Sequence, residues 1–215
     1  MHHQSLPPWD HRWWRLEDVW EEVRKRDFGY LLNNKNDADN RQVLELFYGT
    51  FIIKHLEVYR WITAELISLD VPWSTWFPDI WVMLEPQRWN IPAKWFAVEM
   101  VEAYWNGKEK PEEIQGLDYK KIVDFVEQKK WKKEYKVMSE LFCFHRYKVT
   151  SPLPLREFGK EFLDRTWKFD RIYYLVLDST TKKWNLLVFF IPEKIMKHEV
   201  YDNHMNLEQA HDFQY

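Results

Sequence analysis

Cys143 is the residue with the greatest intrinsic reactivity in this 215-residue chain, and it is the single cysteine. It lies between two phenylalanines, and His145 follows two positions later, so on a strand the thiol and the imidazole would share a face. A cysteine beside a histidine is the nucleophile–base pairing of many cysteine enzymes. No third group that could orient the imidazole is evident, and a buried structural thiol is the commoner situation. We expect Cys143 to be structural.

Histidines and carboxylates gather near the end of the sequence and form a second candidate for chemistry. The members are His198, Asp202, His204, Glu208 and His211. The last three of these, spaced by four and seven positions, would share one helical face and could bind a metal ion there. The spacing matches no known metal motif, so we expect no metal and no cofactor. His55, inside an apolar stretch, is expected to be a hydrogen-bonded core residue.

The densest basic run, QKKWKKEYK, occupies residues 128–136. Lysines interleaved with aromatic rings can contact a phosphate backbone and stack on bases. The alternative is a solvated helix face on which lysine stems cover the rings. The whole chain carries a formal net charge of −3, which favours this alternative. Contact with RNA or an acidic partner is the second hypothesis, and its residues would be Lys129, Lys130, Trp131, Lys132, Lys133 and Lys136.

Common catalytic motifs are missing from the sequence. It has no P-loop, no GxGxxG, no GxSxG, no HExxH and no CxxC, and only 5 glycines. We therefore expect a protein that is not an enzyme. The competing hypothesis is an enzyme or a small-ligand protein with an aromatic pocket within residues 73–95, where tryptophans are frequent. These tryptophans are Trp73, Trp76, Trp81, Trp89 and Trp95.

The long apolar stretch Val43–Leu69 is the element around which the rest is expected to pack. It has no proline and a single glycine, and its apolar residues recur at helical spacing on more than one side. Asp39 followed by Gln42 resembles a capping box, and Pro72 would end the helix. The pattern predicts a long central helix covered by several neighbours.

Prolines divide the stretch that follows. Pro72, Pro78, Pro86 and Pro92 suit the first turns of short helices, so short, tryptophan-rich helices are expected around the long one. The predicted fold class is therefore mainly α with a small β-hairpin (α+β). Four segments are predicted: an aromatic helical extension at 1–40, a helical core at 41–149, a helix plus β-hairpin at 150–192, and a polar, helical tail at 193–215. An exposed linker is expected at 106–116.

The hairpin is predicted from two β-rich runs, Arg171–Leu177 and Trp184–Ile191, which a six-residue loop joins. Both faces of both strands are apolar. Alternation predicts that the helical part buries one face, made of Ile172, Tyr174, Val176, Trp184, Leu186 and Val188. The other face would then be a protein interface, made of Tyr173, Leu175, Leu187 and Phe189.

Two segments resemble a known family. KFDRIYYLVLDSTTKKW, residues 168–184, and HRYKVTSPLPLREFGKEF, residues 145–162, are similar to the N-terminal part of the Nudix-like protein of the mitochondrial ribosome large subunit. The resemblance covers about a fifth of the chain. It departs from the family because the sequence does not continue into most of a Nudix domain and carries no Nudix box. The resemblance implies a structural role and no hydrolase activity.

Composition narrows the functional class. Aromatic residues make up 18% of the chain, more than one core requires, and large aromatics are typical of buried interface centres. No apolar run is long enough to span a membrane, and the single cysteine favours a reducing intracellular compartment, either the mitochondrial matrix or the cytoplasm. We therefore expect a structural, non-catalytic subunit of a large multiprotein complex, with a mitochondrial ribosome or another mitochondrial complex as the candidates, whose partners are other protein subunits.

Overall fold

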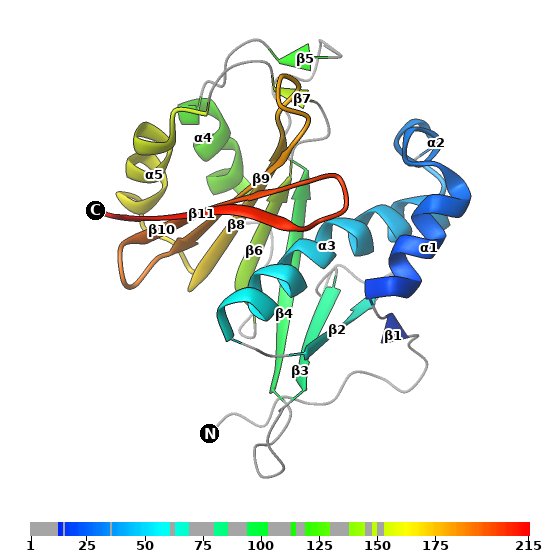
Figure 1. Cartoon of the computed structure of the whole chain (residues 1–215). Coiled ribbons are helices and arrows are strands. Elements are labelled where there is room, and N and C mark those ends of the chain that lie inside the picture. Colours follow the sequence, from blue (N-terminus) through cyan, green and yellow to red (C-terminus); the bar gives the residue numbers. More distant parts are fainter. Residues whose placement is uncertain are drawn as a thin grey trace. The chain divides into compact units, whose positions relative to one another are not determined.

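The computed structural model describes residues 13–14, 16–34, 36–60, 63–68, 80–85, 94–102, 113–114, 119–129, 138–144, 148–149 and 153–215. The chain divides into two compact units, of which unit 1 is Met1–Met100 with Tyr135–Met138 and unit 2 is Val101–Glu134 with Ser139–Tyr215. The described residues form eleven strands and five helices (Figure 1). The predicted mainly α, helical fold is therefore wrong, and the protein is a sheet-rich α+β protein.

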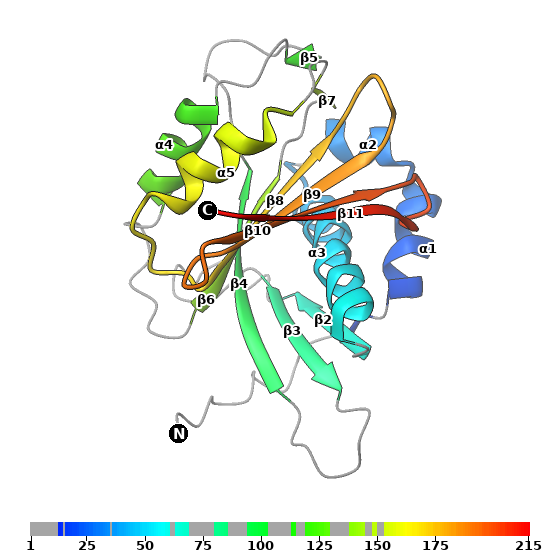
Figure 2. The ribbon, with the colours of Figure 1, turned by 60° about the vertical axis from the view of Figure 1, so that its left-hand side comes forward.

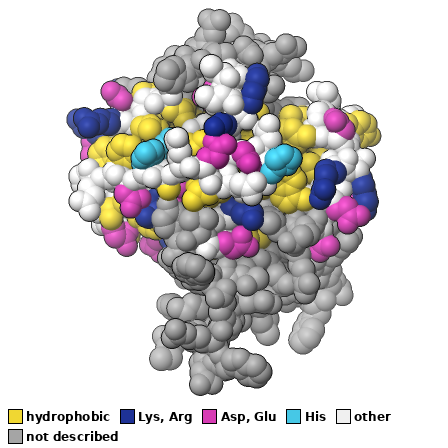
Figure 3. All heavy atoms as spheres, in the orientation of Figure 1, with side chains coloured by type: hydrophobic (Ala, Val, Ile, Leu, Met, Phe, Trp, Pro, Cys, Tyr) yellow, Lys and Arg dark blue, Asp and Glu magenta, His cyan; other side chains and the backbone are white. Residues whose placement is uncertain are grey.

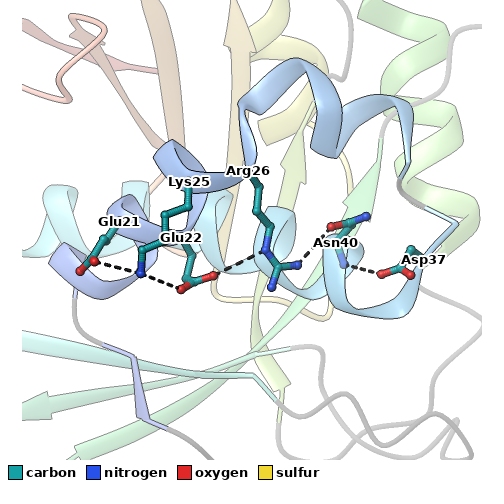
Figure 4. A network of polar contacts seen from close by, with 6 residues as sticks. All are labelled: Glu21, Glu22, Lys25, Arg26, Asp37 and Asn40. Atoms are coloured by element: carbon teal, nitrogen blue, oxygen red, sulfur yellow. Dashed lines mark hydrogen bonds and ion pairs between the residues drawn. The ribbon is translucent and has the colours of Figure 1, made fainter.

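Unit 1 contains the three helices α1 (Leu16–Arg26), α2 (Phe28–Asn33) and α3 (Ala38–Arg60). The apolar side chains of α3 are buried around most of the helix, and the Trp20 and Phe28 rings pack 5.3 Å and 5.0 Å from the Phe47 ring. Polar contacts fix the start of α3, as Figure 4 shows. Asp37 Oδ1 accepts from Asn40 N at 3.1 Å, and Arg26 Nη1 donates to Asn40 Oδ1 at 3.1 Å.

The strands of unit 1 correct two predictions. They are β1 (Trp13–Trp14), β2 (Thr63–Ser68), β3 (Ile80–Glu85) and β4 (Lys94–Glu102), paired antiparallel in that order. The predicted helix Val43–Leu69 is wrong beyond Arg60, because 63–68 pairs as a strand with 80–85. The predicted proline-bounded helices are wrong at 80–85 and 94–102, where proline flanks strands instead, a position that strands also tolerate. The rest of 69–93 lies outside the described residues.

Unit 2 is built on five strands in the order β6-β8-β9-β10-β11. They are β6 (Met138–Phe144), β8 (Arg171–Leu177), β9 (Trp184–Phe190), β10 (Ile195–Tyr201) and β11 (Leu207–Gln214). Strands β6 and β8 are parallel and the other neighbours are antiparallel. The predicted β8–β9 hairpin is confirmed. The predicted helical tail is wrong, because residues 195–214 form two further strands. A separate short pair joins β5 (Glu113–Ile114) to β7 (Lys148–Val149).

Two helices, α4 (Tyr119–Lys129) and α5 (Leu155–Leu163), lie side by side over one face of this sheet (Figures 1 and 2). Phe162 of α5 stacks 4.4 Å from the Phe189 ring, and Phe158 lies 4.7 Å from the Tyr174 ring. Arg165, just after α5, binds Asp124 and Glu127 of α4 and Glu161 of α5. One guanidinium therefore links both helices.

The β8–β9 register decides which residues share a face. Tyr174 lies opposite Leu187, and Ile172 opposite Phe189, so Leu187 and Phe189 belong to the face that the helices cover. The sequence pattern predicted Trp184, Leu186 and Val188 on that face, and this prediction is wrong by one position along β9. The loop closes with Asp178 opposite Lys183, where Asp178 N donates to Lys183 O at 3.0 Å, and this pairing sets which residues of β9 lie on the same face as Ile172 and Tyr174.

Candidate interaction surface

The β10–β11 hairpin ends the described sheet of unit 2, and its turn is well defined. Asp202 Oδ1 accepts from the backbone N–H groups of His204 and Asn206, each at 2.8 Å. Met205 takes a positive φ of 60°, as tight turns often require. The hydrogen bonds from Asn206 and His204 lower the pKa of Asp202. An Asx-type turn of this kind holds the hairpin together locally.

Strand β11 is the last strand in the sheet order, so half of its backbone groups have no described strand beside them. Tyr215 N donates to Lys194 O at 3.1 Å, and the register runs from Ile195 opposite Gln214 to Val200 opposite Gln209. In an antiparallel ladder, hydrogen-bonded pairs alternate with non-bonded pairs.

The alternation separates the residues of β11 into two sets. The backbone groups of Gln209, His211 and Phe213 point toward β10. The N–H and C=O groups of Ala210, Asp212 and Gln214 therefore point away from the sheet. The β8–β9 pair gives the same result independently. Ile191 N donates to Asp170 O, which fixes which residue pairs of β8 and β9 are hydrogen-bonded. Following the registers from β9 to β10 and on to β11 then gives the same set of outward residues.

The edge is accessible. Every residue from Glu208 to Asp212 is exposed, as is Gln214, and Phe213 is half-buried. On the face drawn in Figure 3, acidic and basic side chains lie together along the band that β11 occupies in Figure 1. A register shift at Val200/Tyr201 disturbs the first residues of β11, and from Gln209 to Gln214 the pairing is regular. Regular, exposed edges are the surfaces that accept an additional strand.

Ion pairs hold β11 against the sheet. Lys197 Nζ lies 3.0 Å from both carboxylate oxygens of Asp212, and Lys183 binds Glu208. The Asp212 side chain is nevertheless 60% exposed, whereas that of Lys197 is 20% exposed. The Asp212 carboxylate is therefore open to a further cation on its outer side.

His198 of β10 is buried on the face of the hairpin opposite to that of Lys197 and Asp212, and it pairs with His211 of β11. Its Nε2 lies 2.9 Å from Asn185 Oδ1, and its ring stacks 6.1 Å from the exposed His211 ring. Within the described part of the chain, His198 Nδ1 has no hydrogen-bond partner. Burial first, and then the His211 imidazole, lower the pKa of His198 from 6.5 to about 4. His198 is therefore neutral at physiological pH.

Tyr215 fastens the end of the strand to α5. Its hydroxyl donates to Leu155 O at 3.3 Å, and its ring lies directly over Gly159. A Cβ at position 159 would clash with the Tyr215 ring and hydroxyl. The glycine in α5 is therefore the feature that lets the ring sit there.

Two buried carboxylates elsewhere in the sheet are bound by tyrosine hydroxyls. Tyr173 donates to Glu140 Oε2 at 2.8 Å, while Arg171 Nη1 lies 3.2 Å from Glu140 Oε1. Tyr201 donates to Glu199 Oε2 at 2.5 Å. Burial, together with the Glu140 carboxylate, raises the pKa of Tyr173, so this hydroxyl stays protonated as a donor. These contacts satisfy buried polar groups, which is a structural role.

The structure places the predicted site residues as follows. Cys143 is fully buried in the core of unit 2, and burial raises the pKa of its thiol, so it stays protonated and unreactive at neutral pH. His55 is buried, as expected. In the lysine run, Lys129 ends α4, and residues 130–136 lie outside the described residues, as does His145.

The predicted aromatic pocket lies mostly outside the described residues. Trp81 and Trp95 lie in β3 and β4, and the other three tryptophans of that set are outside the described residues. The predicted linker is also outside, apart from β5. The described residues contain no group of three or more metal-ligating side chains; His211 and Glu208 lie on a strand, not on a helix.

The predicted interface residues do not share a face. Leu187 and Phe189 pack against the helices, whereas Tyr173 and Leu175 alternate to the opposite side, and all four are fully buried. Their assignment to a partner interface stays a prediction. The edge strand, in contrast, was missed by the sequence reasoning. A usable signal was present, because IMKHEVY and LEQAHDFQ flank a turn with Asp202 and Asn203.

Comparisons with protein-family models, with curated proteins and with solved structures found no match to this chain. The resemblance to the Nudix-like ribosomal protein therefore stays a prediction. In the described residues, no helix has the length and apolar character needed to cross a membrane. The mitochondrial and ribosomal assignment finds no support in the fold or in the comparisons, and we do not retain it.

Proposed function

We propose that this protein is a non-catalytic interaction subunit of a multiprotein assembly and that the β11 edge is one of its contact surfaces. The proposal agrees with the functional class expected from the sequence and moves the contact from the faces of the β8–β9 hairpin to an edge strand. A partner would bind by strand addition, in which an extended segment hydrogen-bonds to the open backbone groups.

The observation that carries this proposal is the regular, exposed stretch Gln209–Gln214. Its outward N–H and C=O groups at Ala210, Asp212 and Gln214 form a template that fits a partner strand of any sequence. Proteins that avoid association usually place lysine, proline or a bulge on such an edge. Residues 209–214 contain no lysine and no proline, and the bulge lies before them.

The strand is also held in place before any partner arrives. The Asp202 turn, the Lys197–Asp212 ion pair and the Tyr215 contact with α5 each fix one part of β11. A preformed strand loses less conformational entropy on binding than a flexible segment does. The edge is therefore suited to recognition and not only to closing the sheet.

The test is the variant Ala210→Pro. The Ala210 N–H points outward, so proline removes one donor from the edge and no hydrogen bond from the β10–β11 ladder. Peptides selected by display against the natural protein should lose binding to Ala210→Pro, and they should shift the amide NMR signals of Ala210 and Asp212.

The matched control is His211→Pro, which removes an inward hydrogen bond and should lower the melting temperature, whereas Ala210→Pro should change it little. If the selected peptides bind Ala210→Pro as well as the natural protein and leave both amide signals unmoved, the β11 edge is not a contact surface.

A further inference from the structure

We infer that the β11 edge selects a partner strand with a lysine or arginine directly opposite Asp212, an inference that rests on the proposed function. Strand β11 carries two acidic residues, Glu208 and Asp212, and no lysine or arginine between Leu207 and Gln214. Asp212 is the more exposed of the two, with 60% of its side chain accessible compared with 33% for Glu208. Each carboxylate is already paired with a lysine, Glu208 with Lys183 and Asp212 with Lys197, so the negative charge that the edge offers to a partner is the exposed outer side of Asp212.

The geometry identifies Asp212 as the residue that would contact a charged side chain of the partner strand. Its backbone points outward, so it forms a hydrogen-bonded pair with one residue of an added strand. Side chains of paired residues lie on the same face of the sheet, about 5 Å apart. On that face Asp212 already contacts Lys197 on its inner side. A cation on the added strand would complete a row of Lys197, Asp212 and the partner's lysine or arginine.

The neighbouring positions define the rest of the pattern. On the other face, the added strand would pass beside His211 and Phe213, which are an exposed imidazole and a half-buried ring. An apolar residue on each side of the basic one fits this surface. The preferred partner is therefore an extended segment in which basic and apolar residues alternate.

The same charges disfavour two of the registers in which a second copy of this chain could pair with β11, whereas a register centred on His211, with Asp212 opposite Ala210, brings no like charges together. If two β11 strands paired antiparallel about Ala210, Asp212 would lie opposite Glu208 of the other copy. If they paired about Asp212, the two Asp212 carboxylates would face each other. Like charges directly opposite each other destabilise strand pairs.

Three synthetic peptides test the inference: Thr-Lys-Val-Lys-Val-Lys-Thr and the versions with glutamine or glutamate in place of lysine. The lysine peptide should bind the full chain about threefold more tightly than the glutamine peptide at low salt, and the glutamate peptide more weakly than both. Asp212→Asn should remove most of the preference for lysine. Glu193→Gln, the same loss of charge at an exposed turn position, should preserve it.

The outcomes separate the two proposals. Equal binding of the lysine and glutamine peptides, abolished by Ala210→Pro, would overturn the charge preference and leave the proposed function standing. Binding of none of the peptides, with the Ala210 and Asp212 amide signals unmoved, would count against the edge itself. A concentration-dependent dimer that Ala210→Pro dissociates would show that the occupant is a second copy, and the inference would then be wrong.

Discussion

His198 shows how the position of one side chain sets a pH dependence. Its folded-state pKa of about 4 lies below the unfolded value of 6.5, so the unfolded chain binds more protons between these two values. The stability that depends on neutral His198 is therefore complete above pH 6.5 and is lost as the pH falls through about 4. The full contribution is at most about 3 kcal/mol.

We predict that His198→Gln loses less unfolding free energy than the natural protein between pH 7 and pH 4.5. Urea denaturation at the two pH values measures the difference. His204→Gln, which changes an exposed histidine in the turn, should behave as the natural protein does. Identical losses for the natural protein and His198→Gln would show that His198 is not held neutral by its surroundings.

Gly159 and Tyr215 form a second residue-scale prediction. Alanine at position 159 would displace the Tyr215 ring, while it would also favour the helix by up to about 1 kcal/mol relative to glycine. Gly159→Ala should therefore stabilise the Tyr215→Ala variant more than it stabilises the natural protein. A double-mutant cycle on the unfolding free energy measures this coupling. Additive effects would mean that the ring does not depend on the glycine.

At the scale of elements, Arg165 joins α4 to α5 through three carboxylates of which each is partly exposed. Arg165→Met keeps most of the side-chain length and removes the charge. It should lower the unfolding free energy by about 1–2 kcal/mol at low salt, and by less at 1 M salt. Arg156→Met, at an exposed position of the same helix, is the control. Equal losses of unfolding free energy in both variants would show that Arg165 does not link the two helices.

Sequence patterns predicted some elements and failed at others for identifiable reasons. The β8–β9 hairpin was predictable because its two strands are adjacent, β-branched or aromatic, and joined by a polar loop. Strand β2 was not predictable, because Leu66 and Ile67 fit a helical period as well as a strand. The pairing with residues 80–85 is what decides between helix and strand. Strands β3 and β4 were missed because proline bounds strands as readily as helices.

The candidate site was harder to predict than the elements. His204, Glu208 and His211 have helical spacing, which raised a helical metal site as a candidate that we did not expect to be occupied; the segment instead forms the β10–β11 hairpin. Which backbone groups of β11 point outward depends on the register of three strands, and a single sequence does not specify it. The exclusion of Cys143 as a nucleophile was predictable, because two phenylalanines flank it and burial followed.

In the molecule as a whole, some surfaces stabilise the fold and another is open to recognition. In unit 2, α4 and α5 cover one face of the sheet, and Cys143, Glu140 and Glu199 are all buried within it. Strand β11 alone among the described strands of this unit combines an exposed position with an unpaired ladder. We therefore expect the protein to assemble through this edge.

Residue-resolved amide hydrogen exchange of the free protein tests that claim most directly. We predict alternation along β11: the amides of His211 and Phe213 should exchange at least about tenfold more slowly than those of Ala210 and Asp212. Slow exchange at all four positions would show that the edge is already covered. Slow exchange at Ala210 and Asp212 with fast exchange at His211 and Phe213 would show that the register is shifted by one residue, and either result would contradict the account.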